Sequence, residues 1–90
     1  VLAFRDIWPQ APTHILIIPK RHIRDLSELS AEHGPLLAEV FEVGAELAEA
    51  EGVADSGYRV VANVGPAAGQ SVLHLHFHLL GGRNLSWPPG

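Results

Sequence analysis

Short hydrophobic runs, broken by polar positions, recur at four places along the chain: residues 2–5, 14–18, 58–63 and 72–80. Runs of this length, bounded by proline, glycine or polar residues, are typical of β-strands. In the last run His74, His76 and His78 alternate with leucine and phenylalanine, and a period of two places alternate side chains on opposite faces of a strand. We therefore predict four strands, with three imidazoles on one face of the fourth.

A longer period marks the segment from residue 30 to residue 52. Its apolar positions recur at steps of three and four and are Leu37, Val40, Phe41, Gly44, Leu47 and Ala48, and the opposite side carries Glu39, Glu42, Glu46 and Glu49. This pattern predicts an amphipathic helix of about 21 residues, with Ser30 as its N-cap and Gly52 ending it in a left-handed conformation. One helix flanked by strands predicts an α+β fold, an antiparallel sheet that carries one long helix.

Composition narrows the class of protein. Because 47% of the 90 residues are hydrophobic and 18% are charged, we predict a single globular domain over residues 1–90. A chain of this size buries limited surface and has no cysteine for a disulfide, so we expect a homodimer that shares its core. The absence of cysteine also favours a reducing compartment, and we expect a cytoplasmic protein.

Charge and hydropathy exclude two kinds of partner. A net charge of −4 disfavours non-specific electrostatic binding to a nucleic acid polymer or an anionic membrane surface. No apolar run approaches the about 20 residues that cross a bilayer, so we expect no membrane association. The chain opens at Val1 in a strand-like run and contains no methionine, from which we expect the native protein to have further amino-terminal strands.

The row of histidines is the feature that carries chemistry. Three alternating imidazoles are hard to explain as polar residues that merely face solvent. Zinc is a second explanation, but the Cα atoms of His74 and His78 lie about 13 Å apart on an extended strand, too far for all three to share one ion. Two of the row together with His14 remain able to bind zinc, and a metal analysis after dialysis against a chelator tests this alternative.

Nucleophilic and general acid–base chemistry is the third explanation, and we favour it. A neutral imidazole is nucleophilic near neutral pH, and a neighbouring imidazole can transfer protons. His76 has a partner on each side and is the best placed to attack. Residues 65–71 supply glycines whose backbone N–H groups can approach phosphate oxygens, followed by the hydroxyl of Ser71.

These residues resemble a known family. The run His74-Leu75-His76-Phe77-His78-Leu79-Leu80 matches the alternation of the histidine triad (HIT) superfamily. Pro9-Gln10-Ala11-Pro12-Thr13-His14, followed by Ile18-Pro19-Lys20 and His22, is similar to the second signature of that family. Gly81-Gly82-Arg83 and the ending Trp87-Pro88-Pro89-Gly90 are similar to its Hint branch. The resemblance covers nearly the whole chain.

The resemblance implies an enzyme that needs no cofactor and no metal. It implies hydrolysis of the P–N bond of nucleoside 5′-phosphoramidates, with purine preferred, through a nucleotidyl-histidine intermediate. Two alternatives remain open. One is a dinucleoside polyphosphate hydrolase or nucleotidyltransferase of the same superfamily, and the other is a non-catalytic nucleotide-binding protein.

Roles for individual residues follow from the same resemblance. His76 would be the nucleophile, His74, His78 and His14 would orient and assist it, and Ser71 would help to protonate the leaving amine. Trp87 would lie near the active site of the partner in a homodimer. The resemblance implies that the nucleotide is bound by Phe4, Arg5, Asp6, Ile7, Asn63, Gly69, Gln70, Ser71, His76 and His78, with Phe4 and Ile7 against the purine and Asp6 on the ribose.

Overall fold

The computed structural model describes all 90 residues, Val1–Gly90, and shows one sheet and one α-helix. The strands are β1 (Leu2–Arg5), β2 (Thr13–Ile18), β3 (Tyr58–Val61) and β4 (Phe77–Gly81), and the helix is α1 (Gly34–Ala50). Three short 3₁₀ helices, η1 (Leu26–Glu28), η2 (Ala31–His33) and η3 (Pro66–Ala68), lie in the connections. All strand pairs are antiparallel, in the order β1-β2-β4-β3, so the predicted α+β fold is confirmed.

The sheet brings the histidines of two distant segments together. Strands β2 and β4 pair with His14 opposite Leu80 and Leu16 opposite His78. Residues that lie opposite each other in an antiparallel pair share a face, so His14 and His78 are diagonal neighbours on one face of the sheet. The two strands occupy the centre of the sheet, where both edges of each are paired.

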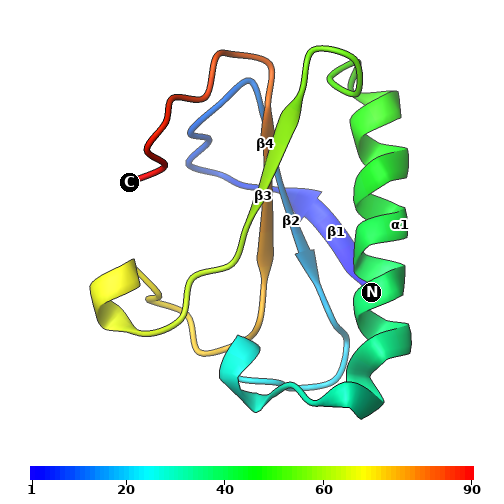
Figure 1. Cartoon of the computed structure of the whole chain (residues 1–90), viewed down its shortest axis with the longest axis vertical. Coiled ribbons are helices and arrows are strands. Elements are labelled where there is room, and N and C mark those ends of the chain that lie inside the picture. The colour runs from blue at the N-terminus through cyan, green and yellow to red at the C-terminus, as the bar shows by residue number, and fades with distance from the viewer.

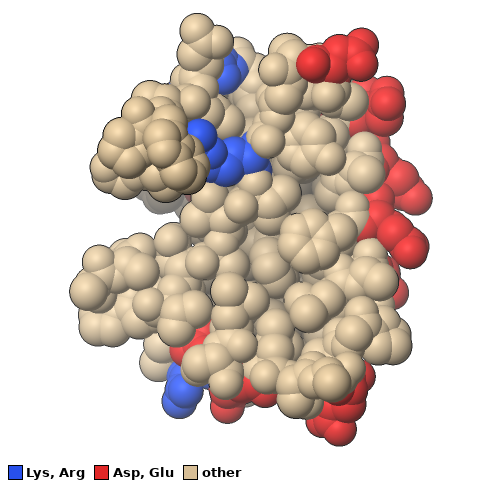
Figure 2. Space-filling model, viewed as in Figure 1, with Lys and Arg blue, Asp and Glu red and all other residues tan.

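The other face of the sheet packs against α1 and holds the core. Ile15, Ile17, Phe77 and Leu79 point to this side and are at most 5% exposed, and Val40 of the helix meets them. The helix lies along one side of the sheet (Figure 1). Its glutamates line the outer face, where Figure 2 shows a column of acidic side chains. The amphipathic pattern therefore places the helix as predicted.

The helix is shorter than predicted, with 17 residues in place of about 21. Ser30 caps a turn of 3₁₀ helix, η2, in which its backbone N–H donates to Nδ1 of His33 at 2.9 Å. The α-helix begins at Gly34, directly before Pro35, because a proline in the first turn breaks no helical hydrogen bond. The predicted end is confirmed, since the chain leaves the helix through Gly52 at φ 73°.

The fourth strand also differs from the prediction, because it begins at Phe77 and not at Val72. Its ladder to β2 stops there, since β2 ends at Ile18 and is followed by Pro19, which has no N–H to donate. Residues 74–76 bond elsewhere, and the Leu75 N–H donates to the carbonyl of Ile23 at 2.6 Å. Strand β3 ends at Val61, which pairs with His78, one residue before the ladder of β4 to β2 ends.

The apolar positions predicted for the helix are mostly used within the chain. Leu37 and Leu47 pack against the core, and only Phe41 of this set is 52% exposed, with its ring edge against Phe77. No helix combines the length and the apolarity needed to cross a membrane.

Candidate active site

Three of the predicted histidines form a contact series. Nε2 of His14 lies 2.8 Å from Nδ1 of His78, and the ring centroids of His78 and His76 are 5.1 Å apart. His14 is buried, whereas His76 and His78 are half-buried. The ring of His74 lies against His22 and not against His76, with centroids 5.3 Å apart. The structure thus brings His14, His78 and His76 together and leaves the His74 ring at the edge of the group.

Hydrogen-bond partners assign the proton of His14 and of His78. The backbone N–H of Gln10 donates to Nδ1 of His14 at 3.0 Å, so this nitrogen is unprotonated. A neutral imidazole carries one proton, which therefore lies on Nε2 of His14. That N–H donates to Nδ1 of His78, and the proton of neutral His78 lies in turn on its Nε2. Nε2–H of His78 is therefore free to donate a hydrogen bond to a group outside the His14–His78 pair.

A backbone carbonyl fixes the proton of His76. Its Nδ1 lies 2.7 Å from the carbonyl oxygen of His74, and a carbonyl only accepts hydrogen bonds. Nδ1 of His76 is therefore protonated, and Nε2 keeps an unshared electron pair. His74 is held similarly, because its Nε2 donates to the carbonyl of Pro19 at 3.1 Å. Backbone carbonyls thus orient both rings, and His76 is left with a nucleophilic nitrogen.

Burial and like charge favour the neutral form of His78. The pKa of this side chain is lowered from the ordinary value of 6.5, mainly because burial disfavours the imidazolium. Positive charge on His76 or His14 would lower it further, whereas the carboxylate of Asp6 acts in the opposite direction. His78 is therefore uncharged at neutral pH and acts as a hydrogen-bond donor through Nε2.

Asp6 adjoins this pair. One carboxylate oxygen, Oδ1, accepts the backbone N–H of Trp8 at 2.8 Å, and Oδ2 lies 3.5 Å from Nε2 of His14. The ligand atoms of Asp6, His14 and His78 all lie within 4.8 Å of one another, as a metal site would require. However, both His14 nitrogens are already engaged in hydrogen bonds, and the 2.8 Å contact is shorter than the about 3.3 Å that separates two nitrogens on one zinc ion. The geometry fits a hydrogen-bonded pair with a nearby carboxylate better than a metal centre.

An apolar groove of about 370 Å³ adjoins His76. It is lined by Phe4, Leu16, Ile18, Val72, His74 and His76. Phe4 was predicted to contact the base, whereas Leu16, Ile18 and Val72 were not among the predicted site residues. Leu16 and Ile18 follow His14 at steps of two, so the period of the strand already places them on the face of His14. Ile7 is 82% exposed and lies outside this groove.

Arg5 does not line the groove, and its part in nucleotide binding stays a prediction. Adjacent residues of a strand point to opposite faces, so Arg5 and Phe4 diverge. The guanidinium of Arg5 makes a bidentate pair with Glu51 beyond the end of α1, at 2.7 and 2.8 Å. Arg5 hydrogen bonds hold the pKa of the Glu51 carboxyl below its ordinary value.

The loop of residues 65–71 is closed by its glutamine. Oε1 of Gln70 accepts the N–H of Gly65 at 2.9 Å, and Nε2 donates to the carbonyls of Arg24 and Val72 at 3.0 and 3.2 Å. The amide of Gln70 therefore holds the loop, and its predicted contact with the nucleotide stays a prediction. Gly69 turns the chain at φ 88°, which favours glycine, and exposed Ser71 follows directly.

Asn63 and Trp87 lie together at another hollow. Both line a space of about 500 Å³ between β3 and the carboxy-terminal tail. Trp87 is 81% exposed, and its ring lies 6.0 Å from the guanidinium carbon of Arg59. The structure therefore places Asn63 beside the tail rather than in the apolar groove.

Known proteins share this arrangement of sequence and fold. Residues 1–85 match the HIT domain family. A purine nucleoside phosphoramidase of Escherichia coli is 54% identical over 85 residues, which cover 94% of this chain and 71% of that protein. A 14 kDa zinc-binding protein of Zea mays is 54% identical over 94 residues, covering 100% of this chain and 71% of that protein.

A solved structure of a similar protein has the same fold. The crystal structure of a HIT family hydrolase from Legionella pneumophila superposes with a TM-score of 0.95 at 53% sequence identity, covering 98% of this chain and 79% of that one. The family match, these relatives and the shared fold confirm the resemblance seen in the sequence and show that the chain belongs to the HIT domain family.

Proposed function

We propose that this protein hydrolyses purine nucleoside 5′-phosphoramidates through a nucleotidyl intermediate on His76. The observation that carries the proposal is the 2.7 Å hydrogen bond from Nδ1 of His76 to the carbonyl of His74, which leaves Nε2 free to attack. The activity of the E. coli relative, which is named a purine nucleoside phosphoramidase, supports the class of substrate.

The surroundings of His76 suit a nucleotide. The groove lined by Phe4, Leu16, Ile18 and Val72 offers an apolar slot for the flat base beside the nucleophile. Asp6 is the acceptor proposed for the ribose hydroxyls, as its carboxylate adjoins His14 at one end of the site. The backbone N–H groups of the loop at Gly69 and Ser71 are the proposed donors to the phosphate oxygens.

The reaction proceeds in two displacements at phosphorus. In the first, Nε2 of His76 forms a bond to phosphorus while the P–N bond breaks. The leaving nitrogen takes a proton from the Ser71 hydroxyl as that hydroxyl takes one from solvent, and the nitrogen departs as an amine. In the second, the oxygen of water bonds to phosphorus and the P–Nε2 bond breaks. One proton of this water returns to solvent, and the nucleoside monophosphate is released with His76 regenerated.

The neighbouring histidines stabilise the charges that develop during the reaction. Attack makes the His76 ring cationic, and the carbonyl of His74 accepts a stronger hydrogen bond from Nδ1 in that state. Nε2–H of His78 is the proposed donor to a phosphate oxygen, since its proton is held there by His14. Such donors stabilise charge that grows at phosphorus in the transition state.

We further propose that two copies of the chain associate at the β3 edge of the sheet. Strand β3 is the last in the order β1-β2-β4-β3, so one row of its backbone groups is unpaired within the chain. The hollow of about 500 Å³ between β3 and the tail adjoins this edge. Figure 2 shows a notch between the tail and the loop around η3. A second copy seated there would bring each Trp87 tail toward the other active site.

Replacing His76 with Asn tests the nucleophile. We expect turnover of an adenosine 5′-phosphoramidate to fall by several orders of magnitude, roughly the loss seen when a nucleophile is removed. Binding of adenosine monophosphate, measured by calorimetry, should change little because the groove residues are intact. Mass spectrometry after a quench that avoids acid should find a nucleotidyl adduct on the peptide containing His76 in the wild type alone.

Two comparisons make this test specific. His22→Asn, at an exposed histidine outside the contact series, is the matched control and should retain the adduct. Dinucleoside polyphosphates should turn over more slowly than phosphoramidates, with and without a chelator. An adduct on His74 or His78 would overturn the assignment, and turnover abolished by the chelator would favour a metal-assisted reaction.

The lowered pKa of His78 predicts a pH dependence. The unfolded chain protonates this side chain near the ordinary value of 6.5, and the folded chain does so only at lower pH. As pH falls through 6.5 and then through the folded pKa, the unfolded state gains the proton first, so the free energy of unfolding decreases. The NMR titration of the His78 imidazole should therefore have its midpoint below 6.5. A midpoint at or above this value contradicts the account.

Deleting residues 86–90 tests the tail and the dimer. We expect the deletion to change the relative rates for different amine leaving groups more than it changes binding of the nucleoside monophosphate. The intact chain should sediment as a dimer at micromolar concentration. Equal effects on all substrates would count against the tail, and a monomer in sedimentation would refute the association.

A further inference from the structure

The turn that follows β4 packs against the loop that precedes β2. A Cβ atom added at Gly82, where φ is +89°, would lie 3.0 Å from Cβ of Pro12. The next residue, Arg83, donates from Nε to the carbonyl of Gln10 at 2.9 Å and from Nη1 to the carbonyl of Asn84 at 2.9 Å. The guanidinium therefore joins the carboxy-terminal turn to residue 10 across 73 positions of sequence.

Gln10 is the residue whose backbone N–H donates to Nδ1 of His14. A continuous series of hydrogen bonds thus runs from Arg83 to the carbonyl of Gln10, from the amide of Gln10 to His14, and from His14 to His78, at 2.9, 3.0 and 2.8 Å. The side chain of Gln10 contributes one more bond, from Nε2 to the carbonyl of Trp8 at 3.1 Å. Arg83 is the member of the series that holds the loop of Gln10 to the turn after β4.

We propose that Arg83 is a positioning residue for the active site, which fixes the tautomers of His14 and His78 by holding Gln10 in place. The consequence for turnover rests on the proposed function, whereas the consequence for the tautomers does not. Arg83 itself contacts neither His14 nor His78 and acts only through the backbone of Gln10.

Two tautomeric arrangements of the pair compete. With the amide of Gln10 against Nδ1, His14 donates from Nε2 and His78 keeps its proton on Nε2. Without that amide, Nδ1 of His14 is free to carry the proton, and Nε2 then becomes an acceptor. His78 must donate from Nδ1 to keep the bond, which leaves its Nε2 without a proton in the neutral ring. The donor that faces the phosphate is lost in the second arrangement.

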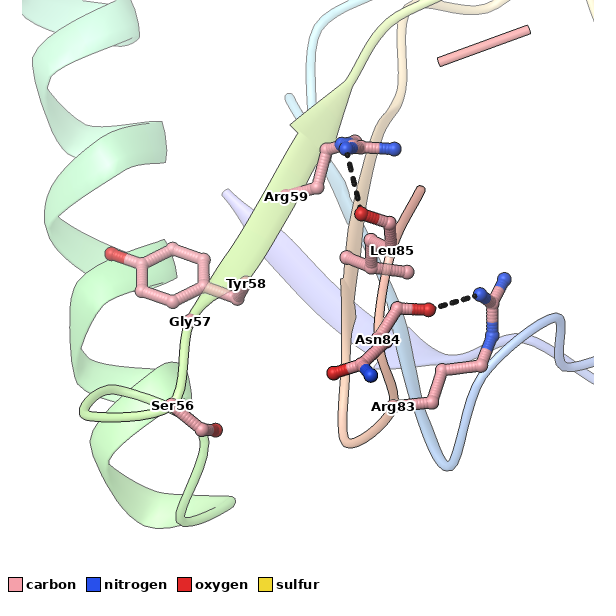
Figure 3. Close-up of a pocket in the computed structure, with 7 residues that line it drawn as sticks. All are labelled: Ser56, Gly57, Tyr58, Arg59, Arg83, Asn84 and Leu85. Carbon is pink, nitrogen blue, oxygen red and sulfur yellow. Dashed lines mark hydrogen bonds between the residues drawn. The ribbon is translucent and has the colours of Figure 1, made fainter. Parts of the chain in front are cut away.

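Arg59 provides a matched control in the same pocket. The two arginines line a polar pocket of about 350 Å³ together with Ser56, Tyr58 and Asn84. Figure 3 shows Arg83 bonded to the carbonyl of Asn84 and Arg59 bonded to that of Leu85. Arg59 donates to the carbonyls of Leu85 and Ser86 in the tail, at 3.4 and 3.0 Å, and makes no bond to the loop of Gln10. Its removal deletes a similar guanidinium without touching the series.

The test is an NMR measurement of the imidazole nitrogens in ¹⁵N-labelled full chain without substrate, above the pH at which His78 is protonated. The wild type should show a proton on Nε2 of both His14 and His78. In Arg83→Ala the nitrogen signals of both rings should move together toward the averages of two tautomers, and in Arg59→Ala they should not move. Arg83→Lys, which keeps one donor, should give an intermediate shift and serves as the readout if Arg83→Ala does not fold.

Kinetics add a second readout. For an adenosine 5′-phosphoramidate, we expect kcat of Arg83→Ala to fall about fivefold, the factor that one hydrogen bond of ordinary net strength gives, with a smaller change in KM. Unchanged tautomers in both Arg83 variants would overturn the inference, as would an equal shift in Arg59→Ala. Shifted tautomers in a protein that hydrolyses no phosphoramidate would refute the proposed function and leave the positioning role intact.

Discussion

The hydrogen bond between Nδ1 of His76 and the carbonyl of His74 determines what this site can do. A histidine that donates from Nδ1 must keep its electron pair on Nε2, so a backbone carbonyl selects the nucleophilic nitrogen. The bond exists because residues 74–76 leave the strand ladder, which begins only at Phe77. Regular pairing of this segment would have directed the same carbonyl to a neighbouring strand.

The pairing of β2 with β4 sets the positions of the other histidines in the site. The register that sets Leu16 opposite His78 also places His14 diagonally beside it, and a buried Leu79 fixes which face each residue occupies. Around this frame the chain uses backbone groups to orient imidazoles: the Gln10 amide for His14, and carbonyls for His76 and His74. Backbone groups are held by the fold itself and lose little entropy when they orient a side chain.

Periodicity predicted most of the fold, because the chain buries one face of each element. The alternation predicted one apolar face for the last strand, and Leu75, Phe77 and Leu79 are indeed buried opposite the histidines, whereas Leu73 of the same row is 62% exposed. The prediction also began the strand five residues too early. That error has a local cause, since a period of two describes the pleat and says nothing about whether a partner strand is present. Pro19, which ends that partner, was visible in the sequence.

The site was predicted in part, and what was missed follows from what a sequence shows. His14 and His76 were found because imidazole is a rare and reactive side chain, whereas the Gln10 amide and the His74 carbonyl are backbone groups that every residue has. The opposite directions of the Phe4 and Arg5 side chains could have been predicted from the period of the strand alone.

The most direct test of the account is the protonation of the His76 nitrogens, read from long-range ¹H–¹⁵N NMR correlations in the neutral protein. The account predicts a protonated Nδ1 and an unprotonated Nε2, and a proton on Nε2 would contradict it.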